Sequence, residues 1–98
     1  MNKVFETETF ADELNRCTQD ELEWIDKIRD QLKENFNIGK VLRYYWFREK
    51  KYKGRRLYFV TNTRTRKALL ISIGSKKEQE ETIKAILQNM DYYLGFIS

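Results

Sequence analysis

The spacing of hydrophobic residues predicts two helices in the first third of the chain. The longer helix begins with a capping-box pair, Thr18 and Glu21, and carries apolar residues every three or four positions. We expect it to end at residues 37–39, where Asn-Ile-Gly interrupts the pattern. A brief helix precedes it, from an N-cap at Thr9 to Cys17. The apolar positions of the longer helix are Leu22, Ile25, Ile28, Leu32 and Phe36.

The middle of the chain changes from helical spacing to the alternation typical of strands. Three strands are predicted over residues 42–49, 56–62 and 68–73, and their short connections favour an antiparallel meander. The first connection ends at Gly54, a residue free to adopt positive φ. The last strand is almost continuously apolar, which is typical of a strand inside a sheet. A short extended opening, residues 3–6, supplies a fourth strand.

A final helix follows the strands. Ser75 and Glu78 repeat the capping-box pattern, and apolar residues then recur at helical spacing until Gly95. The predicted order is β-α-α-β-β-β-α, an α+β fold with two N-terminal helices and a C-terminal helix on a mainly antiparallel, four-stranded sheet. We expect the helices to cover one sheet face and to leave the other at least partly open. The 98 residues contain no linker, so one domain over residues 1–98 is expected.

Composition excludes several kinds of chemistry. The chain has no histidine and one cysteine, Cys17, so a histidine base, a catalytic triad and a structural zinc site lack the residues to build them. No glycine-rich phosphate loop is present. We therefore expect neither a cofactor nor a metal. A single cysteine favours a reducing compartment, and no apolar stretch is long enough to cross a membrane, so we expect a cytoplasmic protein.

Positive charge is concentrated in the middle of the sequence. Between Lys40 and Lys67 there are eleven lysines and arginines and one acid, Glu49, so this segment carries +10 although the whole chain carries only +4. The segment is also rich in aromatic residues, which stack on unpaired bases while cations neutralise phosphates. We expect one basic sheet surface that binds nucleic acid, RNA in particular, with Tyr52 and Tyr58 facing the ligand. The predicted contact residues are Arg43, Lys51, Tyr52, Lys53, Arg55, Tyr58, Arg64 and Arg66.

Two stretches of this region resemble a known family. Residues 52–60 (YKGRRLYFV) and 71–77 (ISIGSKK), together with the predicted element order, are similar to the RelE/ParE superfamily of type II toxins. The resemblance implies a RelE-like domain. RelE-type members are ribonucleases that cut messenger RNA in the ribosomal A site, whereas ParE-type members inhibit DNA gyrase. Both are neutralised by a small antitoxin, so a cognate antitoxin and the ribosome with its mRNA are the implied partners.

The resemblance also implies candidate catalytic residues. Arg56, two positions after Gly54, matches the catalytic arginine of the family. An ungapped alignment places Phe47 and Glu49 where the family has paired strand lysines, and a shift of one residue places a basic pair there instead. Ile83 stands where some members have a tyrosine. The candidate catalytic residues are therefore Arg56, then Lys76 and Lys77 after the last strand, and Arg48 and Lys50 from the shifted alignment.

Three functions are consistent with the sequence. The first is a RelE-like, ribosome-dependent mRNA endonuclease that inhibits translation, in which Arg56 and the lysines after the last strand stabilise the charge that builds on phosphorus. The second is a ParE-like, non-catalytic toxin that acts on DNA gyrase. The third is a basic-sheet nucleic-acid-binding module without catalytic activity.

Overall fold

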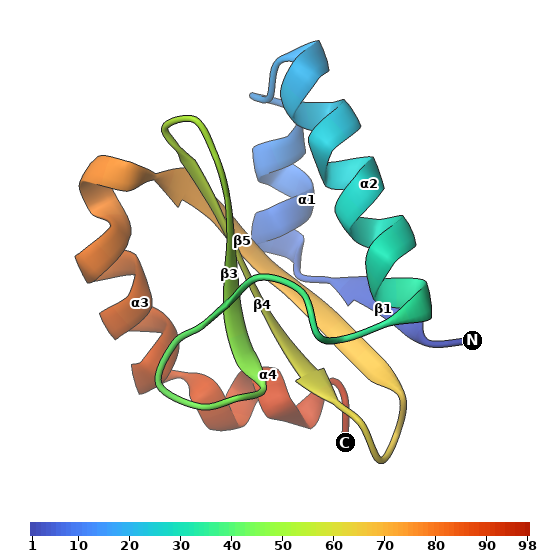
Figure 1. Ribbon diagram of the computed structural model, residues 1–98. Coiled ribbons are helices and arrows are strands. Elements are labelled where there is room, and N and C mark those ends of the chain that lie inside the picture. The colour runs from blue at the N-terminus through green and yellow to red at the C-terminus, as the bar shows by residue number, and fades with distance from the viewer.

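A five-stranded sheet forms the centre of the molecule in the computed structural model, which describes all residues 1–98 (Figure 1). The strands lie in the spatial order β1-β5-β4-β3-β2, and every neighbouring pair is antiparallel except β1 and β5, which are parallel. The predicted α+β class and the mainly antiparallel sheet are confirmed. There are five strands rather than four because a two-residue strand, β2, adds to the edge of β3. The strands are β1 (Lys3–Glu6), β2 (Lys40–Val41), β3 (Phe47–Tyr52), β4 (Arg55–Asn62) and β5 (Lys67–Ser75).

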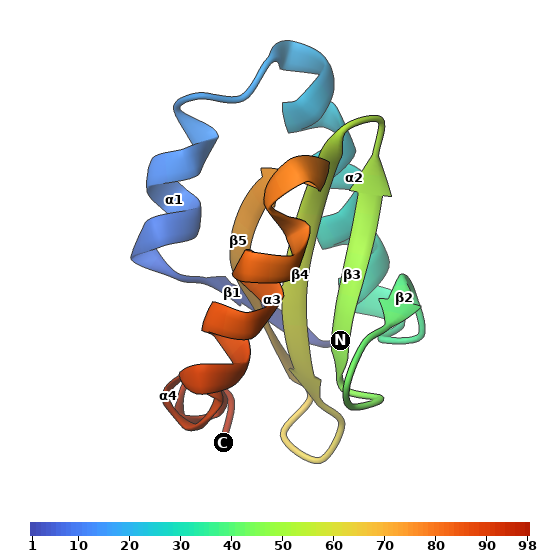
Figure 2. The same ribbon diagram turned by 90° about the vertical axis from the view of Figure 1, so that its left-hand side faces the viewer.

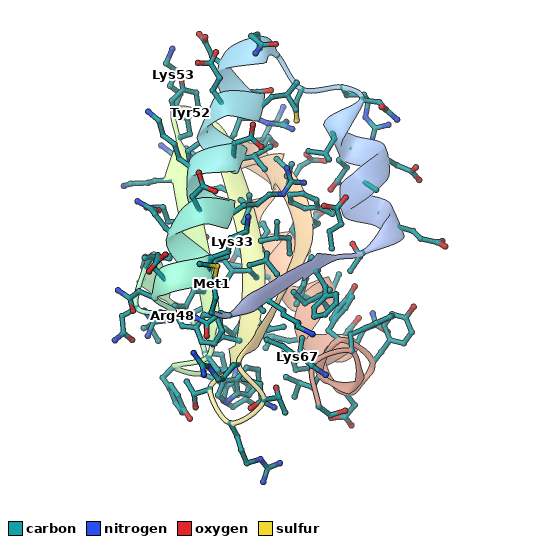
Figure 3. All side chains as sticks on the ribbon, turned by 90° about the vertical axis from the view of Figure 1, so that its right-hand side faces the viewer. Met1, Lys33, Arg48, Tyr52, Lys53 and Lys67 are labelled. Carbon is teal, nitrogen blue, oxygen red and sulfur yellow. The ribbon has the colours of Figure 1, made fainter.

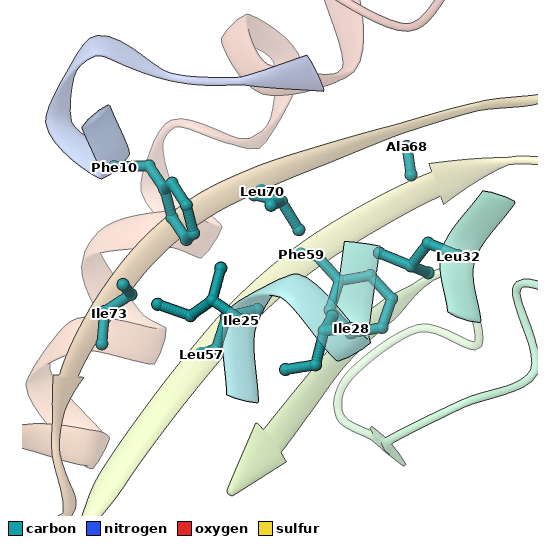
Figure 4. Close-up of a cluster of buried hydrophobic side chains, with 9 residues drawn as sticks. All are labelled: Phe10, Ile25, Ile28, Leu32, Leu57, Phe59, Ala68, Leu70 and Ile73. Carbon is teal, nitrogen blue, oxygen red and sulfur yellow. The ribbon is translucent and has the colours of Figure 1, made fainter. Parts of the chain in front are cut away.

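Helices cover both faces of the sheet (Figures 1 and 2). Helices α1 (Glu8–Leu14) and α2 (Gln19–Glu34) pack on one face, and α3 (Gln79–Gln88) and α4 (Met90–Gly95) pack on the other. The expectation that all helices cover a single face is wrong, because β4 and β5 direct apolar side chains to both sides and α3 and α4 pack on the second face. One core cluster comprises Phe10, Ile25, Ile28, Leu32, Leu57, Phe59, Ala68, Leu70 and Ile73 (Figure 4), and the other comprises Phe47, Tyr58, Val60, Leu69, Ile71, Ile86, Met90 and Ile97.

Side-chain caps define where the N-terminal helices begin. The Thr18 hydroxyl accepts a hydrogen bond from the Glu21 N–H, and the Glu21 carboxylate accepts one from the Thr18 N–H, which confirms the predicted capping box. The brief first helix is capped by Thr7 and not by Thr9, because the Thr7 hydroxyl accepts the Phe10 N–H. This helix is therefore shifted toward the N-terminus. No helix of the molecule is long and apolar enough to span a membrane.

The segment between α2 and β3 departs most from the sequence interpretation. Asn35 already has an extended backbone, and its side chain accepts the Asn37 N–H, so α2 ends before residues 37–39. The predicted strand over 42–49 begins only at Phe47, since residues 42–46 form a turn closed by a hydrogen bond from the Phe47 N–H to the Tyr44 carbonyl. The alternating aromatics of this segment resemble a strand pattern, but two of them stack on each other instead.

Two tight backbone positions shape the end of the sheet. Gly39 has φ +80°, and a Cβ atom there would lie 2.7 Å from the Glu49 carbonyl oxygen, so only glycine lets β2 approach β3 this closely. In the β3–β4 turn, Lys53 and not Gly54 has positive φ, at 53°.

The predicted final helix is divided into two, because the backbone at Asn89 leaves the helical conformation between α3 and α4.

Candidate nucleic-acid interface

A polar groove lies beside the first turn of α3, over the ends of β3 and β4. It has a volume of about 510 Å³ and no hydrophobic side chain lines it. Five of its eight lining residues are lysines or arginines, and a single carboxylate stands among them. We call it the cationic groove. Its residues are Gly39, Lys40, Glu49, Lys50, Lys51, Arg56, Lys76 and Gln79.

Strand register places most of these side chains on one face of the sheet. Arg56 pairs with Lys51 across β3 and β4, while Glu49 pairs with Tyr58 on one side and with Lys40 on the other. Directly opposed residues of antiparallel strands point to the same face. Tyr58 belongs to the core cluster under α3 and α4, so the whole row faces α3.

The chain after β5 brings Lys76 to the groove. The Lys76 N–H donates to the Gly54 carbonyl over 2.7 Å, which joins this segment to the β3–β4 turn. A short 3₁₀ helix, Lys76–Glu78, follows, and the Ser75 hydroxyl both accepts the Glu78 N–H and donates to the Glu78 carboxylate. Half of the predicted capping box is therefore present. The other half is absent, because the Glu78 carboxylate accepts from the Ser75 hydroxyl and not from the Ser75 N–H.

Glu49 and Arg56 form the floor of the groove. Their side chains are only 4% and 8% exposed, and Arg56 Nε lies 3.8 Å from Glu49 Oε1. Gln79, the first residue of α3, donates from Nε2 to Glu49 Oε2 over 2.7 Å. Arg56 Nη1 donates to the carbonyls of Lys53 and Arg55 over 3.0 and 2.8 Å. The guanidinium is thus held in one orientation by Nη1, while its buried Nε has no hydrogen-bond partner.

Tyr58 lies beneath the groove and not on its surface. Its side chain is fully buried and its hydroxyl has no hydrogen-bond partner. Burial, and to a smaller extent the charge of Glu49, raises the pKa of the Tyr58 phenol to about 12, so the phenol stays protonated at neutral pH. The expectation that Tyr58 faces a ligand is therefore wrong. Tyr58 follows two arginines in the sequence, and this charged context favours a surface position although the residue belongs to the core.

Tyr52, the other aromatic expected to face a ligand, lies on the opposite side of the sheet. Its ring stacks on Trp24 of α2, with centroids 5.4 Å apart and planes inclined by 22°. The ammonium group of Lys53 lies 5.3 Å from the centre of the Tyr52 ring. Tyr52 and Lys53, which are labelled in Figure 3, lie near the start of α2. Tyr52 therefore joins β3 to α2 and does not line the cationic groove.

Two further predicted residues are engaged in contacts within the protein. Arg55 Nε lies 3.4 Å from a carboxylate oxygen of Glu21 on α2, on the face opposite the groove. Arg48 Nε donates to the Tyr45 carbonyl over 2.8 Å, and its Nη1 reaches the Ile38 carbonyl at 3.4 Å. Arg48 therefore holds together the loop that leads from α2 into β3.

The remaining basic residues are dispersed. The β4–β5 turn, residues 63–66, lies at the end of β4 away from the groove, so its arginines are distant from it. Figure 3 likewise shows Lys53 and Lys67 at opposite ends of the sheet. The expectation of one surface that gathers all the positive charge is wrong. Lys50, Lys51, Arg56 and Lys76 line the groove, whereas Arg43, Arg48, Lys53, Arg55, Arg64, Arg66 and Lys77 do not.

Sequence reasoning missed four residues of the groove, which are Gly39, Lys40, Glu49 and Gln79. Glu49 carries a usable signal, because it is the only acid between Lys40 and Lys67. Lys40 was counted within the basic segment but not assigned to a site, since no local pattern predicts the two-residue strand β2. Gln79 has no sequence signal, because only the packing of α3 brings it to Glu49. No three acidic or cysteine side chains gather into a set that would hold a metal ion.

The five-stranded sheet, with two helices between β1 and β2 and two after β5, has a RelE-like fold, which confirms the predicted architecture. Among solved structures, the isolated E. coli RelE toxin matches with a TM-score of 0.67 and 18% identity, over 88% of this chain and 99% of that chain. A mutant E. coli RelE toxin in complex with an antitoxin RelBc peptide matches with a TM-score of 0.67 and 16% identity, over 83% and 93%. No family model and no curated protein matches the sequence.

Proposed function

We propose that this chain is the toxin of a toxin–antitoxin pair and that it inhibits translation by cleaving messenger RNA at the ribosome. The observation that carries the proposal is the cationic groove, in which five cations surround one buried carboxylate on a RelE-like fold. The cations provide phosphate contacts, and the carboxylate adds a group that accepts protons. We find no group of residues that favours an action on gyrase in the way that the cationic groove favours RNA cleavage.

The groove contains the groups that cleavage of RNA by its own 2′-hydroxyl requires. Glu49 accepts the proton of the 2′-hydroxyl as the 2′-oxygen bonds to phosphorus. Arg56, held by its Nη1 bonds, stabilises the added negative charge on the phosphorane oxygens. The bond from phosphorus to the 5′-oxygen then breaks, and a lysine ammonium of the groove protonates that leaving oxygen. The products are a 2′,3′-cyclic phosphate and a free 5′-hydroxyl.

The fold also supports a protein partner. One of the structurally similar proteins is a RelE toxin bound to an antitoxin RelBc peptide. We therefore propose that a cognate antitoxin binds this chain and suppresses its activity. Co-expression of the two should restore growth.

The function is tested by comparing Arg56→Ala with Arg55→Ala. The two arginines are adjacent, but Arg56 lines the groove and Arg55 faces α2. Induced expression of the unaltered chain should stop growth and produce cut transcripts. Arg56→Ala should slow cleavage by about 10²- to 10³-fold, the usual loss for one charge-stabilising donor, and relieve the growth arrest. Arg55→Ala should keep both effects.

Removal of Arg56 leaves Glu49 without its cation, so the fold of the variant must be checked by circular dichroism. Arg56→Lys, which keeps the positive charge, is the second variant and should recover part of the activity. Growth arrest that persists in Arg56→Ala with intact transcripts would contradict cleavage. A gyrase supercoiling assay would then test the alternative target. Salt-sensitive RNA binding without any toxicity would instead favour a plain binding module.

A further inference from the structure

A stacked aromatic pair lies on the turn that leads into β3. The rings of Tyr44 and Trp46 are nearly parallel, with planes inclined by 6° and centroids 4.6 Å apart. Tyr44 is 44% exposed, so the stack ends at the surface. Contiguous exposed apolar patches mark interaction sites, whereas single exposed apolar residues are normal. Neither ring belongs to the cationic groove.

The pair forms one wall of a second concavity, which we call the aromatic hollow. The hollow has a volume of about 520 Å³ and lies between the turn 42–46 and the α3–α4 junction. Across from the pair, Tyr92 is 66% exposed, and Phe96 contacts its ring edge-on with centroids 5.2 Å apart. The lining residues include Leu87, Met90 and Leu94. The hollow therefore offers flat and apolar surfaces at the same place.

The turn that carries the pair is rigid. The Leu42 N–H donates to the Phe47 carbonyl, and the Phe47 N–H donates to the Tyr44 carbonyl, both over 2.9 Å. Arg48 closes the turn from outside by donating to the Tyr45 carbonyl. A preorganised aromatic plane loses little conformational entropy when a ligand stacks on it. Arg48 is thus a positioning residue for this turn.

The loop that carries the pair is positively charged, which favours a negatively charged occupant over a neutral one, and its continuity with the cationic groove points to the RNA strand bound there. Residues 35–48 contain Lys40, Arg43 and Arg48 and no acid, while one carboxylate, Asp91 of α4, lines the hollow itself. Lys40 also lines the cationic groove, so the same loop contributes to both concavities. Gln79 at the groove and Leu87 at the hollow are separated by about 12 Å of α3. That length corresponds to roughly three or four stacked nucleotides of one strand at 3.4 Å each.

We propose that the Tyr44–Trp46 pair is a stacking site for an unpaired base of the same RNA strand whose phosphate occupies the cationic groove. This inference rests on the proposed function, because it takes RNA as the ligand of the groove. The phosphates fix the strand in the groove, and the stacked base fixes its register along α3. Stacking on the pair requires an unpaired base, so the site selects single-stranded over paired RNA. Stacking is largely indifferent to which base it is.

The test measures binding of a 2′-O-methyl RNA of about eight nucleotides, which has no free 2′-hydroxyl and is not cleaved. Trp24→Phe makes Trp46 the only tryptophan, and its fluorescence should be quenched when a base stacks. Tyr44→Leu should weaken binding by about 5- to 100-fold, the usual range for one stacked base. Tyr44→Phe, which keeps an aromatic ring and adds no second tryptophan, should retain binding. Tyr45→Leu, at the exposed tyrosine outside the stack, should have no effect.

An abasic oligonucleotide of the same length separates stacking from phosphate binding. Tyr44→Leu should not change its affinity, whereas Arg56→Ala should weaken both oligonucleotides. Equal losses on both, or no loss on either, would overturn the stacking site. So would a Tyr44→Leu variant that binds RNA normally but loses self-association or antitoxin binding, since the hollow would then be a protein interface. Failure of the unaltered chain to cleave messenger RNA on ribosomes would contradict the proposed function alone.

Discussion

The two faces of the sheet are covered to different extents. On one face, α2 is a single helix of 16 residues with Ile25, Ile28 and Leu32 fully buried. On the other, α3 has 10 residues and α4 has 6, and the two are divided at Asn89. The first face is therefore closed by one long amphipathic helix together with α1. The second is closed only in part, and both concavities described above lie on it.

The difference shows how one strand serves the core and a site at once. On β4, Val60 and Tyr58 are buried under α3 and α4, and Arg56 continues the same row at the end of the strand. The alternation of side chains is the same at all three positions. The three positions differ in whether a helix packs over them. Helix α3 begins at Gln79, beside the groove that Arg56 lines. The end of the helical cover therefore decides where the face becomes polar.

Core truncation provides the largest test of this comparison. Phe59→Ala, at the centre of the closed face, should lower the free energy of unfolding by about 3–5 kcal/mol, because it removes a fully buried ring. Met90→Ala lies at the first residue of α4 and is 8% exposed, so its cost should be near 2 kcal/mol, the low end for methionine. Urea denaturation measures both. Equal losses would show that the two faces contribute equally to stability.

Much of the fold was predictable because its signals are local. The Thr18 capping box and the strand over 56–62 each depend on a few adjacent residues, and both are present, the strand one residue longer. The cover on the second face was not predictable in this way. Tyr58 and Arg56 are polar residue types, so the sequence predicts a ligand surface for their row, and only the position of α3 separates Tyr58 in the core from Arg56 on the floor of the groove.

The groove was predictable only in part for the same reason. Arg56 and Lys51 follow from the hairpin, because adjacent antiparallel strands bring them together. Gln79 and Lys40 lie 39 positions apart in the chain and meet through tertiary packing alone. Glu49 was visible as an isolated acid, but its burial and its bond to Gln79 were not.

The partly covered face should differ from the closed one in activity. Glu49→Gln keeps the size of the side chain but removes the proton acceptor, so RNA cleavage should fall by about 10²- to 10⁴-fold. Glu80→Gln is the matched control, because it changes the same residue type at an exposed position next to Gln79. Single-turnover cleavage rates, with thermal unfolding of both variants, measure the effect. A Glu49→Gln variant as fast as Glu80→Gln would exclude Glu49 as the base.

The smallest effect concerns the closed face, where a carboxylate has a purely structural contact. Glu13 of α1 accepts the Ile73 N–H of β5 over 2.8 Å. Desolvation raises the pKa of Glu13 above its usual 4.5, and the Ile73 hydrogen bond and Arg16 oppose this shift only in part. The folded state therefore binds the Glu13 proton more tightly than the unfolded state. Its contribution to stability is complete below pH 4.5 and is lost as the pH rises through the folded pKa.

Two substitutions at Glu13 separate the hydrogen bond from the charge. Glu13→Gln retains an oxygen that accepts the Ile73 N–H but does not ionise, so the free energy of unfolding at pH 7 should be unchanged or higher. Its dependence on pH just above 4.5 should also be flatter. Glu13→Ala leaves the N–H unpaired and should cost about 1–3 kcal/mol. Neither variant should alter RNA cleavage, because Glu13 lies outside the cationic groove. A loss of cleavage in Glu13→Gln would mean that the closed face is coupled to the groove through β5.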